Sequence, residues 1–281
     1  MIKKYLSKYF PVFLLPTLIA FFISFLVPFA MGMYLSLCEF TTVSNARFVG
    51  FDNYIKAFGQ GTDFLNALWF TVKFTVVSVI TVNLIAFILA LILTRPMRGT
   101  NAFRTGFFMP NLVGGIVLGY IWQIIINGVL GYFGVDITFD ASYGFWGLVI
   151  LTNWQQIGYM MIIYIAGIQN VPNDMLEAAD IDGATYLQKL RYIILPTVSS
   201  AVTICTFLTL TNSFKLFDQN LALTGGAPGN KTAMLALDIY KTFYNRVGYE
   251  GVGQAKAVVF FIIVALIALL QQYITREREE N

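Results

Sequence analysis

Charged residues divide this chain into long uncharged segments. Six windows contain no Asp, Glu, Lys or Arg: Tyr9–Cys38, Phe74–Thr94, Thr105–Val135, Ala141–Asn173, Tyr192–Phe214 and Ala257–Thr275. Each window reaches the roughly 18 residues that cross a hydrocarbon core about 30 Å thick. Backbone polar groups inside lipid must be satisfied within the protein, so runs this long and apolar favour helices over barrel strands.

The windows predict an all-α, polytopic membrane protein with six transmembrane helices. The expected helices lie at about 12–37, 68–94, 106–127, 144–169, 193–217 and 255–275. Residues 1–8 form a cytoplasmic N-terminus in this prediction, and residues 9–281 form a single transmembrane domain. Lys3, Lys4 and Lys8 precede a first apolar run that is too long for a signal peptide, so we expect it to be a retained helix.

The composition supports a membrane protein and excludes several other classes. Of the 281 residues, 57% are hydrophobic and only 12% are charged, whereas about a quarter are charged in soluble domains. The net charge of +3 gives no reason to expect nucleic acid. The chain has no His, the commonest metal ligand and general base. We predict no catalytic residue, no metal and no cofactor, and we expect Cys38 and Cys205 to be small buried hydrophobes.

Positive charge sets the orientation of such a chain, because Lys and Arg collect on the cytoplasmic side. With both termini inside, Arg95, Arg98 and Arg104 lie in one short cytoplasmic loop and Lys189 and Arg191 in another. The external loops carry their Lys and Arg at lower density. This orientation therefore also places the loop at 172–192 in the cytoplasm.

The loop at 172–192 contains the pattern of a short capped helix. Asp174 is placed to be its N-cap, with Glu177 three residues later as in a capping box. Gly183 is placed to end it in the left-handed conformation. Short helices are marginal alone, so this helix is expected to dock on a partner.

The same loop carries a resemblance to a known family. Its pattern is Glu177-Ala178-Ala179, three residues, Gly183, nine residues, then Ile193-x-Leu195-Pro196. This resembles the EAA loop of binding-protein-dependent ABC importer permeases. The resemblance implies a coupling helix that fits a groove on an ATP-hydrolysing subunit, with Glu177, Ala178, Ala179, Asp182 and Gly183 as its coupling residues. An ordinary amphipathic loop helix is the alternative. The segment Phe48-Val49-Gly50-Phe51-Asp52-Asn53-Tyr54 resembles the carbohydrate-transporting (MalF-like) members of that family.

The fourth predicted helix carries a polar face. Thr152, Gln155, Gln156 and Tyr159 follow i, i+3, i+4, i+7 spacing near the middle of the span. Polar groups there are costly and usually face a cavity or a partner, and amides and hydroxyls suit sugar hydroxyls. Hydrogen bonds between helices are the alternative role. Asn212 and Ser213 extend the predicted substrate site to the fifth helix, and Lys215 with Asp218 is expected to form an interfacial ion pair.

The resemblance implies the permease subunit of an ABC importer that moves a carbohydrate, an oligosaccharide or related glycoside, across the plasma membrane of a prokaryote. The implied partners are a second homologous permease, ATP-hydrolysing subunits, an extracytoplasmic sugar-binding protein and membrane lipid.

Two other classes remain open. A self-sufficient secondary transporter or channel is disfavoured because no predicted helix centre carries a charge. A membrane enzyme would need Asp174, Asp180 and Asp182 as metal ligands, but Asp180 and Asp182 point to different faces of a helix. The segment Gly225–Thr232 is not a P-loop, because Asn230 stands where glycine must precede the lysine.

Overall fold

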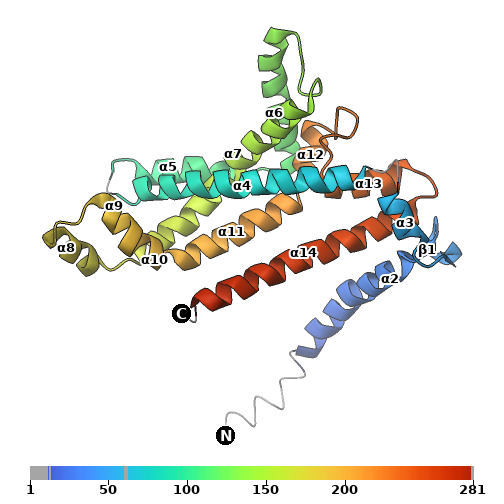
Figure 1. The fold of residues 1–281 in the computed structure, drawn as a ribbon, viewed down its shortest axis with the longest axis horizontal. Coiled ribbons are helices and arrows are strands. Elements are labelled where there is room, and N and C mark those ends of the chain that lie inside the picture. The colour runs from blue at the N-terminus through green and yellow to red at the C-terminus, as the bar shows by residue number, and fades with distance from the viewer. Residues whose placement is uncertain (1–11, 13, 60–62, 96, 280–281) are drawn as a thin grey trace, which may run out of the picture. The chain divides into compact units, whose positions relative to one another are not determined.

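The structure is a computed structural model that describes residues 12, 14–59, 63–95 and 97–279, the last six of these by backbone alone. The predicted cytoplasmic segment 1–8 lies outside the described residues. Helices make up most of the described chain, which confirms the all-α prediction (Figure 1). The elements of the first half are η1 (Phe22–Leu26), α2 (Val27–Leu35), β1 (Cys38–Glu39), η2 (Val43–Asn45), β2 (Arg47–Phe48), α3 (Asp52–Phe58), α4 (Phe64–Leu93), α5 (Thr100–Phe108), η3 (Met109–Leu112), α6 (Gly115–Leu130) and η4 (Gly131–Phe133). Those of the second half are α7 (Ala141–Gln169), α8 (Asn173–Ile181), α9 (Tyr186–Lys189), η5 (Leu190–Ile194), α10 (Leu195–Thr197), α11 (Ser199–Phe214), α12 (Asp218–Leu223), α13 (Leu235–Asn245) and α14 (Glu250–Glu279).

Within the described chain, five helices are long and apolar enough to cross a membrane. They are Leu14–Leu35, Phe64–Leu93, Gly115–Phe133, Ala141–Gln169 and Glu250–Tyr273. A sixth span is obtained when Tyr186–Thr197 and Ser199–Phe214, which meet at a 69° bend, are counted together. The six windows therefore correspond to six helical segments.

The third predicted helix, 106–127, is wrong as a continuous element. The chain forms α5, then the 3-10 turn η3, and only then α6. Pro110 lies at the start of η3, and Val113 and Gly114 are extended, with ψ of 134° and 141°. Proline cannot donate the backbone hydrogen bond that a continuing helix needs, which accounts for the break.

The fifth predicted helix, 193–217, is likewise not straight. It begins inside the π-helical turn η5, passes through the short α10 and bends at Val198 before α11. Pro196 lies at the start of α10, where its missing N–H removes a helical hydrogen bond. Val198 is fully buried at the bend, so the kink is fixed by packing.

The chain divides into two compact units, of which the smaller comprises Met1–Thr62 with Ile239–Ile262. Its described part contains a two-stranded antiparallel pair, β1 with β2, which the all-α prediction did not include. Gly50 takes a φ of +63°, which turns the chain two positions before α3 begins. Asn53 is buried and donates from Nδ2 to the carbonyls of Ser36 at 3.0 Å and Cys38 at 2.8 Å. The asparagine of the Phe48–Tyr54 segment thus ties the start of α3 to the chain that leads from α2 into β1.

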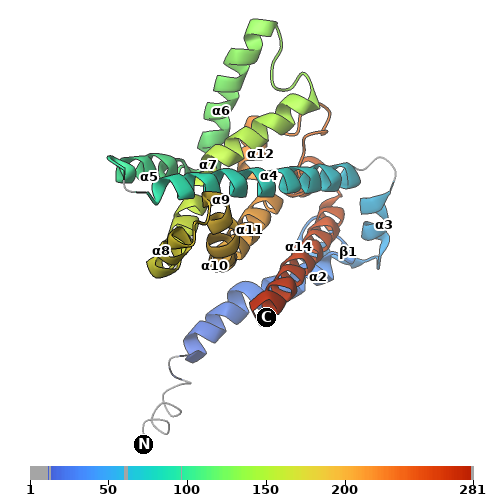
Figure 2. The same cartoon turned by 60° about the vertical axis from the view of Figure 1, so that its left-hand side comes forward.

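The larger unit comprises Asp63–Asp238 with Ile263–Asn281. In it, α4 packs along both α7 and α11 (Figures 1 and 2). The Tyr164 hydroxyl donates to Asn83 Oδ1 at 2.8 Å, and Asn83 Nδ2 donates to Thr209 Oγ1 at 3.3 Å, so the three helices also share polar bonds. Cys205 is buried in this core and Cys38 in the other unit, both as free thiols, which confirms their prediction.

Candidate functional site

A polar cavity of about 380 Å³ lies where α7, α11 and the segment after α11 meet η3. Its lining residues are Asn111, Gln155, Gln156, Asn212, Lys215, Leu216, Phe217, Asp218 and Gln219. Five of these carry carboxamides, which both donate and accept hydrogen bonds. Such a wall suits a neutral ligand rich in hydroxyl groups.

Gln155 is held in place by two neighbours of different elements. Its Oε1 accepts a 2.7 Å hydrogen bond from Gln219 Nε2 on α12, and its Nε2 donates to the Val113 carbonyl at 3.3 Å. α12 in turn packs closely on α6, because a Cβ added at Gly119 would lie 2.5 Å from the Ala222 Cβ. Gly119 therefore allows the two helices to approach closely.

The predicted ion pair between Lys215 and Asp218 is wrong. In the described part of the chain, neither Lys215 nor Asp218 takes part in an ion pair. Lys215 and Asp218 instead both line the cavity, because α11 ends at Phe214 and the chain turns there into α12. The cavity thus holds one charge of each sign, which spacing alone did not indicate.

The cavity brings together Gln155, Gln156 and Asn212 of the predicted substrate residues. Thr152 and Ser213 do not line it; both are fully buried, and their hydroxyl oxygens have no hydrogen-bond partner. Tyr159 is 37% exposed and its ring centroid lies 6.5 Å from that of Phe108, also outside the cavity lining. The Gln156 Oε1 atom is buried and without a partner as well.

Asn111 and Gln219 are cavity residues that sequence reasoning missed. Asn111 follows Pro110 at the helix break, and Gln219 lies in the short α12 beyond the fifth span. An amide beside a proline inside an apolar window was the available signal for Asn111. The sequence gives no comparable signal for Gln219, because the turn after α11 decides whether its side chain reaches the cavity.

The loop helix α8 begins differently from the prediction. Pro172, with φ −62° and ψ 129°, is the N-cap, and its carbonyl accepts from the Met175 N–H at 3.2 Å. Asp174 lies inside the first turn and does not cap the helix. The proline fixes the backbone for helix entry, and the Asp174 carboxylate still lies where the helix dipole favours negative charge.

The end of α8 agrees with the prediction. Gly183 has a φ of +75°, the left-handed conformation. Its N–H donates to the Asp180 carbonyl at 3.1 Å, and the Ala184 N–H donates to the Ala179 carbonyl at 2.9 Å. These two bonds form a Schellman motif, which turns the chain sharply toward α9.

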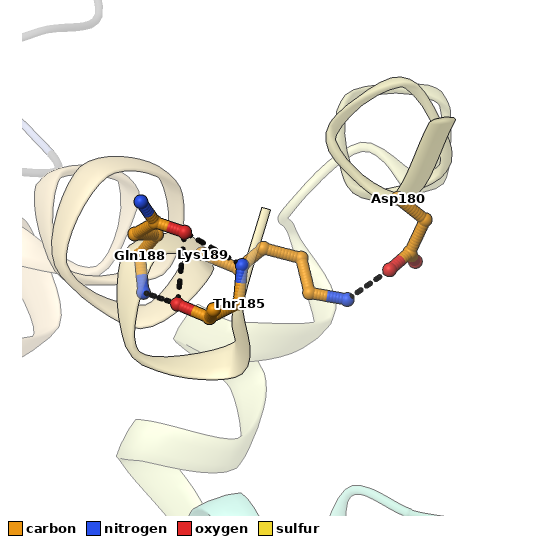
Figure 3. A network of polar contacts seen from close by, with 4 residues as sticks. All are labelled: Asp180, Thr185, Gln188 and Lys189. Atoms are coloured by element: carbon orange, nitrogen blue, oxygen red, sulfur yellow. Dashed lines mark hydrogen bonds and ion pairs between the residues drawn. The ribbon is translucent and has the colours of Figure 1, made fainter. Parts of the chain in front are cut away.

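Two contacts fix the path from α8 to α9 (Figure 3). Lys189 Nζ forms an ion pair with Asp180 Oδ1 at 2.5 Å. Thr185 and Gln188 form a capping box at the start of α9. Apolar side chains remain uncovered on both helices, with Ile181 87% and Leu187 74% exposed. Exposed apolar side chains of this size on a short loop are typical of an interaction surface.

Among the residues that the structure describes, no group of three Cys, Asp or Glu side chains could hold a metal ion.

Apolar helices around a polar cavity, with a short loop helix after one of them, are the features of a membrane transport component. Residues 98–279 match the family described as binding-protein-dependent transport system inner membrane component. The chain belongs to this family and is a multi-pass membrane protein of the prokaryotic plasma membrane.

Curated relatives cover nearly the whole chain. It is 42% identical over 276 residues to a probable starch degradation products transport system permease protein, AmyD, of Thermoanaerobacterium thermosulfurigenes, covering 95% of this chain and 94% of the relative. It is 28% identical over 289 residues to the multiple sugar-binding transport system permease protein MsmF of Streptococcus mutans, covering 99% of each. A solved bacterial ABC transporter that imports the acidic polysaccharide alginate has the same fold, with a TM-score of 0.82, 20% identity and 98% of both chains covered.

Proposed function

We propose that this chain is the permease subunit of an ABC importer that carries an oligosaccharide across the plasma membrane, driven by ATP hydrolysis on a separate subunit. The observation that carries the proposal is the cavity lined by five carboxamides. It belongs to a chain whose curated relatives are named for transport of starch degradation products and multiple sugars.

The cavity favours a neutral sugar. Lys215 and Asp218 contribute opposite charges, so the lining has no net charge that would select an acidic or a basic ligand. Carboxamides from η3, α7, α11 and α12 supply paired donors and acceptors for sugar hydroxyls, and Phe217 offers an apolar surface for a sugar ring. Short glucose oligomers from starch meet these requirements and agree with the 42% identical relative.

The substrate residues of this proposal are Gln155, Gln156 and Asn212, which line the cavity, together with Thr152, Tyr159 and Ser213. The hydroxyl oxygens of Thr152 and Ser213 are buried without a partner, an arrangement that costs free energy. If α7 separates from α11 in another conformation, these hydroxyls become exposed and can form hydrogen bonds with the substrate. Alternating access of this kind requires that substrate and ATP bind the two conformations with different affinity.

Coupling is assigned to α8. Glu177, Ala178, Ala179, Asp182 and Gly183 form the surface and turn that dock on an ATP-hydrolysing subunit, with both termini of the chain in the cytoplasm. A second homologous permease completes the membrane channel, and an extracytoplasmic sugar-binding protein delivers the substrate. The exposed Ile181 and Leu187 supply the apolar part of the docking surface.

The test is purification of the tagged chain from its native membranes in mild detergent, followed by reconstitution into liposomes. We expect an ATPase and a second permease in fixed ratio, and ATP-dependent uptake of labelled maltotriose when the binding protein is added. A chain that is isolated alone, with uptake insensitive to ATP, would contradict the proposal and favour a self-sufficient carrier.

A further inference from the structure

The ion pair between Asp180 and Lys189 crosses the turn that separates two helices. Asp180 lies in the last turn of α8, and Lys189 is the last residue of α9 (Figure 3). Lys189 Nζ and Asp180 Oδ1 are 2.5 Å apart, and the side chains are 18% and 60% exposed, respectively. The lysine is therefore held largely against protein while the carboxylate stays in solvent.

Lys189 stands on a helix that continues into the membrane. α9 passes without interruption through η5 into α10, and the 69° bend at Val198 then leads into α11. The start of α9 is held by a capping box, in which Gln188 Oε1 accepts from Thr185 N at 2.7 Å and from Thr185 Oγ1 at 2.8 Å. A force applied to Lys189 therefore acts on the inner end of the fifth span.

The turn between the helices cannot transmit that force alone. It consists of Asp182–Thr185 and contains the left-handed Gly183, and the two backbone bonds of its Schellman motif do not reach α9. Glycine is the residue that resists backbone rotation least. Among the described residues, the Asp180–Lys189 pair is a direct polar contact between the side chains of α8 and α9.

An ion pair whose carboxylate lies in solvent adds little to folding stability, so we assign its importance to the angle that it sets between α8 and α9. We propose that the Asp180–Lys189 pair is a strut that keeps α8 rigidly attached to α9, so that displacement of α8 moves the fifth span. Both are positioning residues, and neither is among the coupling residues assigned from the EAA pattern. The inference rests on the proposed function, in which α8 docks on the ATPase.

The reconstituted complex tests the strut through the number of maltotriose molecules imported per ATP hydrolysed. Lys189→Met and Asp180→Asn each remove one charge, and the double variant Asp180→Lys/Lys189→Asp restores a pair of opposite polarity. Asp174→Asn is the matched control, because it removes the same charge from the same helix at an exposed residue without an ion pair.

We expect each single variant to lower the import ratio by about five-fold, the factor that corresponds to about 1 kcal/mol, while ATP hydrolysis and the amount of assembled complex stay near wild type. The double variant should recover most of the ratio, and Asp174→Asn should leave it unchanged. Single variants with a wild-type ratio would overturn the strut. A reversed pair that stays as poor as the single variants would overturn it too, because it would assign the effect to contacts of one side chain with the ATPase. Failure of the wild-type complex to import maltotriose would instead count against the proposed function. The wild-type assay comes first, so this outcome is distinguished from failure of the strut.

Discussion

Gln219 Nε2 donates a 2.7 Å hydrogen bond to Gln155 Oε1, and this bond joins α12 to α7 in the wall of the polar cavity. The two residues are 64 positions apart in the chain. Because Gln155 also donates to the Val113 carbonyl, its amide is oriented by partners on both sides.

Replacement of Gln219 by Leu is expected to weaken substrate handling without unfolding the protein. A neutral hydrogen bond contributes about 0.5–1.5 kcal/mol, so the concentration for half-maximal maltotriose uptake should rise by about two- to ten-fold. Uptake kinetics in liposomes measure this effect. Asn101→Leu, at an exposed position of α5, is the control and should leave the kinetics unchanged. Wild-type kinetics for Gln219→Leu would mean that this part of the cavity wall does not contact the transported substrate.

Gly158 lies at a close approach of α7 to the backbone of α5. A Cβ at this position would overlap the backbone carbonyl of Phe107, which cannot rotate away as a side chain can. Gly158→Ala should therefore destabilise the larger unit by about 1–3 kcal/mol through overpacking. The thermal unfolding midpoint in detergent measures the change. Gly128→Ala is the matched control, because a Cβ there meets open space, and it should be neutral or slightly stabilising. Equal midpoints for the two variants would contradict the close approach.

Gly183 provides the left-handed end of α8, with a φ of +75°. The left-handed conformation costs an L residue about 1–2 kcal/mol, and more for a β-branched one. Gly183→Val should disturb the Schellman bonds and lower maltotriose import per ATP, while the complex still assembles. Gly183→Asn should be milder, since asparagine tolerates this conformation. Full ATP-driven uptake by Gly183→Val would show that the turn is not needed for coupling.

Asp140 is the N-cap of α7, and its protonation links stability to pH. The Ser142 hydroxyl and backbone N–H donate to its Oδ1 at 2.6 and 2.8 Å, and they hold the pKa of this carboxyl below its ordinary value of 3.8. A carboxyl whose pKa is lower in the folded state stabilises the fold above its unfolded-state pKa, and this contribution is lost as the pH falls through the folded-state pKa.

The unfolding midpoint, measured between about pH 6 and pH 3, should therefore fall more steeply for the wild type than for Asp140→Asn. Asparagine caps a helix about as well as aspartate but does not titrate. Parallel curves would mean that the cap makes no pH-dependent contribution.

The sequence indicated most of the membrane architecture because charge is excluded from hydrocarbon. Each uncharged window holds a helical segment, and Gly183 was placed correctly because a left-handed helix end is a local event at one residue. The predicted start of α8 is wrong because it also rests on a local pattern, and two neighbouring residues could each cap the helix. The local pattern predicts Asp174 as the N-cap, whereas the N-cap is Pro172, two positions earlier.

The candidate site was less accessible from the sequence. The spacing of Thr152, Gln155, Gln156 and Tyr159 places them on one helix face, but packing of α11 and η3 against that face leaves only Gln155 and Gln156 in the cavity. The three-residue separation of Lys215 and Asp218 predicts an ion pair between them. Side chains with this spacing meet only when both residues lie in one continuous helix. The helix ends at Phe214, so both side chains turn toward the cavity.

By itself, the sequence determined that this chain forms membrane-spanning helices and a short loop helix that ends at Gly183, because those features follow from local hydropathy and local backbone preference. The tertiary structure decided where Pro110 and Pro196 break their spans, which amides face one another across the cavity, and that Lys189 reaches Asp180. Those outcomes depend on how segments far apart in the chain pack. A one-residue change in where a helix ends redirects every side chain beyond it, and only the packed structure fixes that residue.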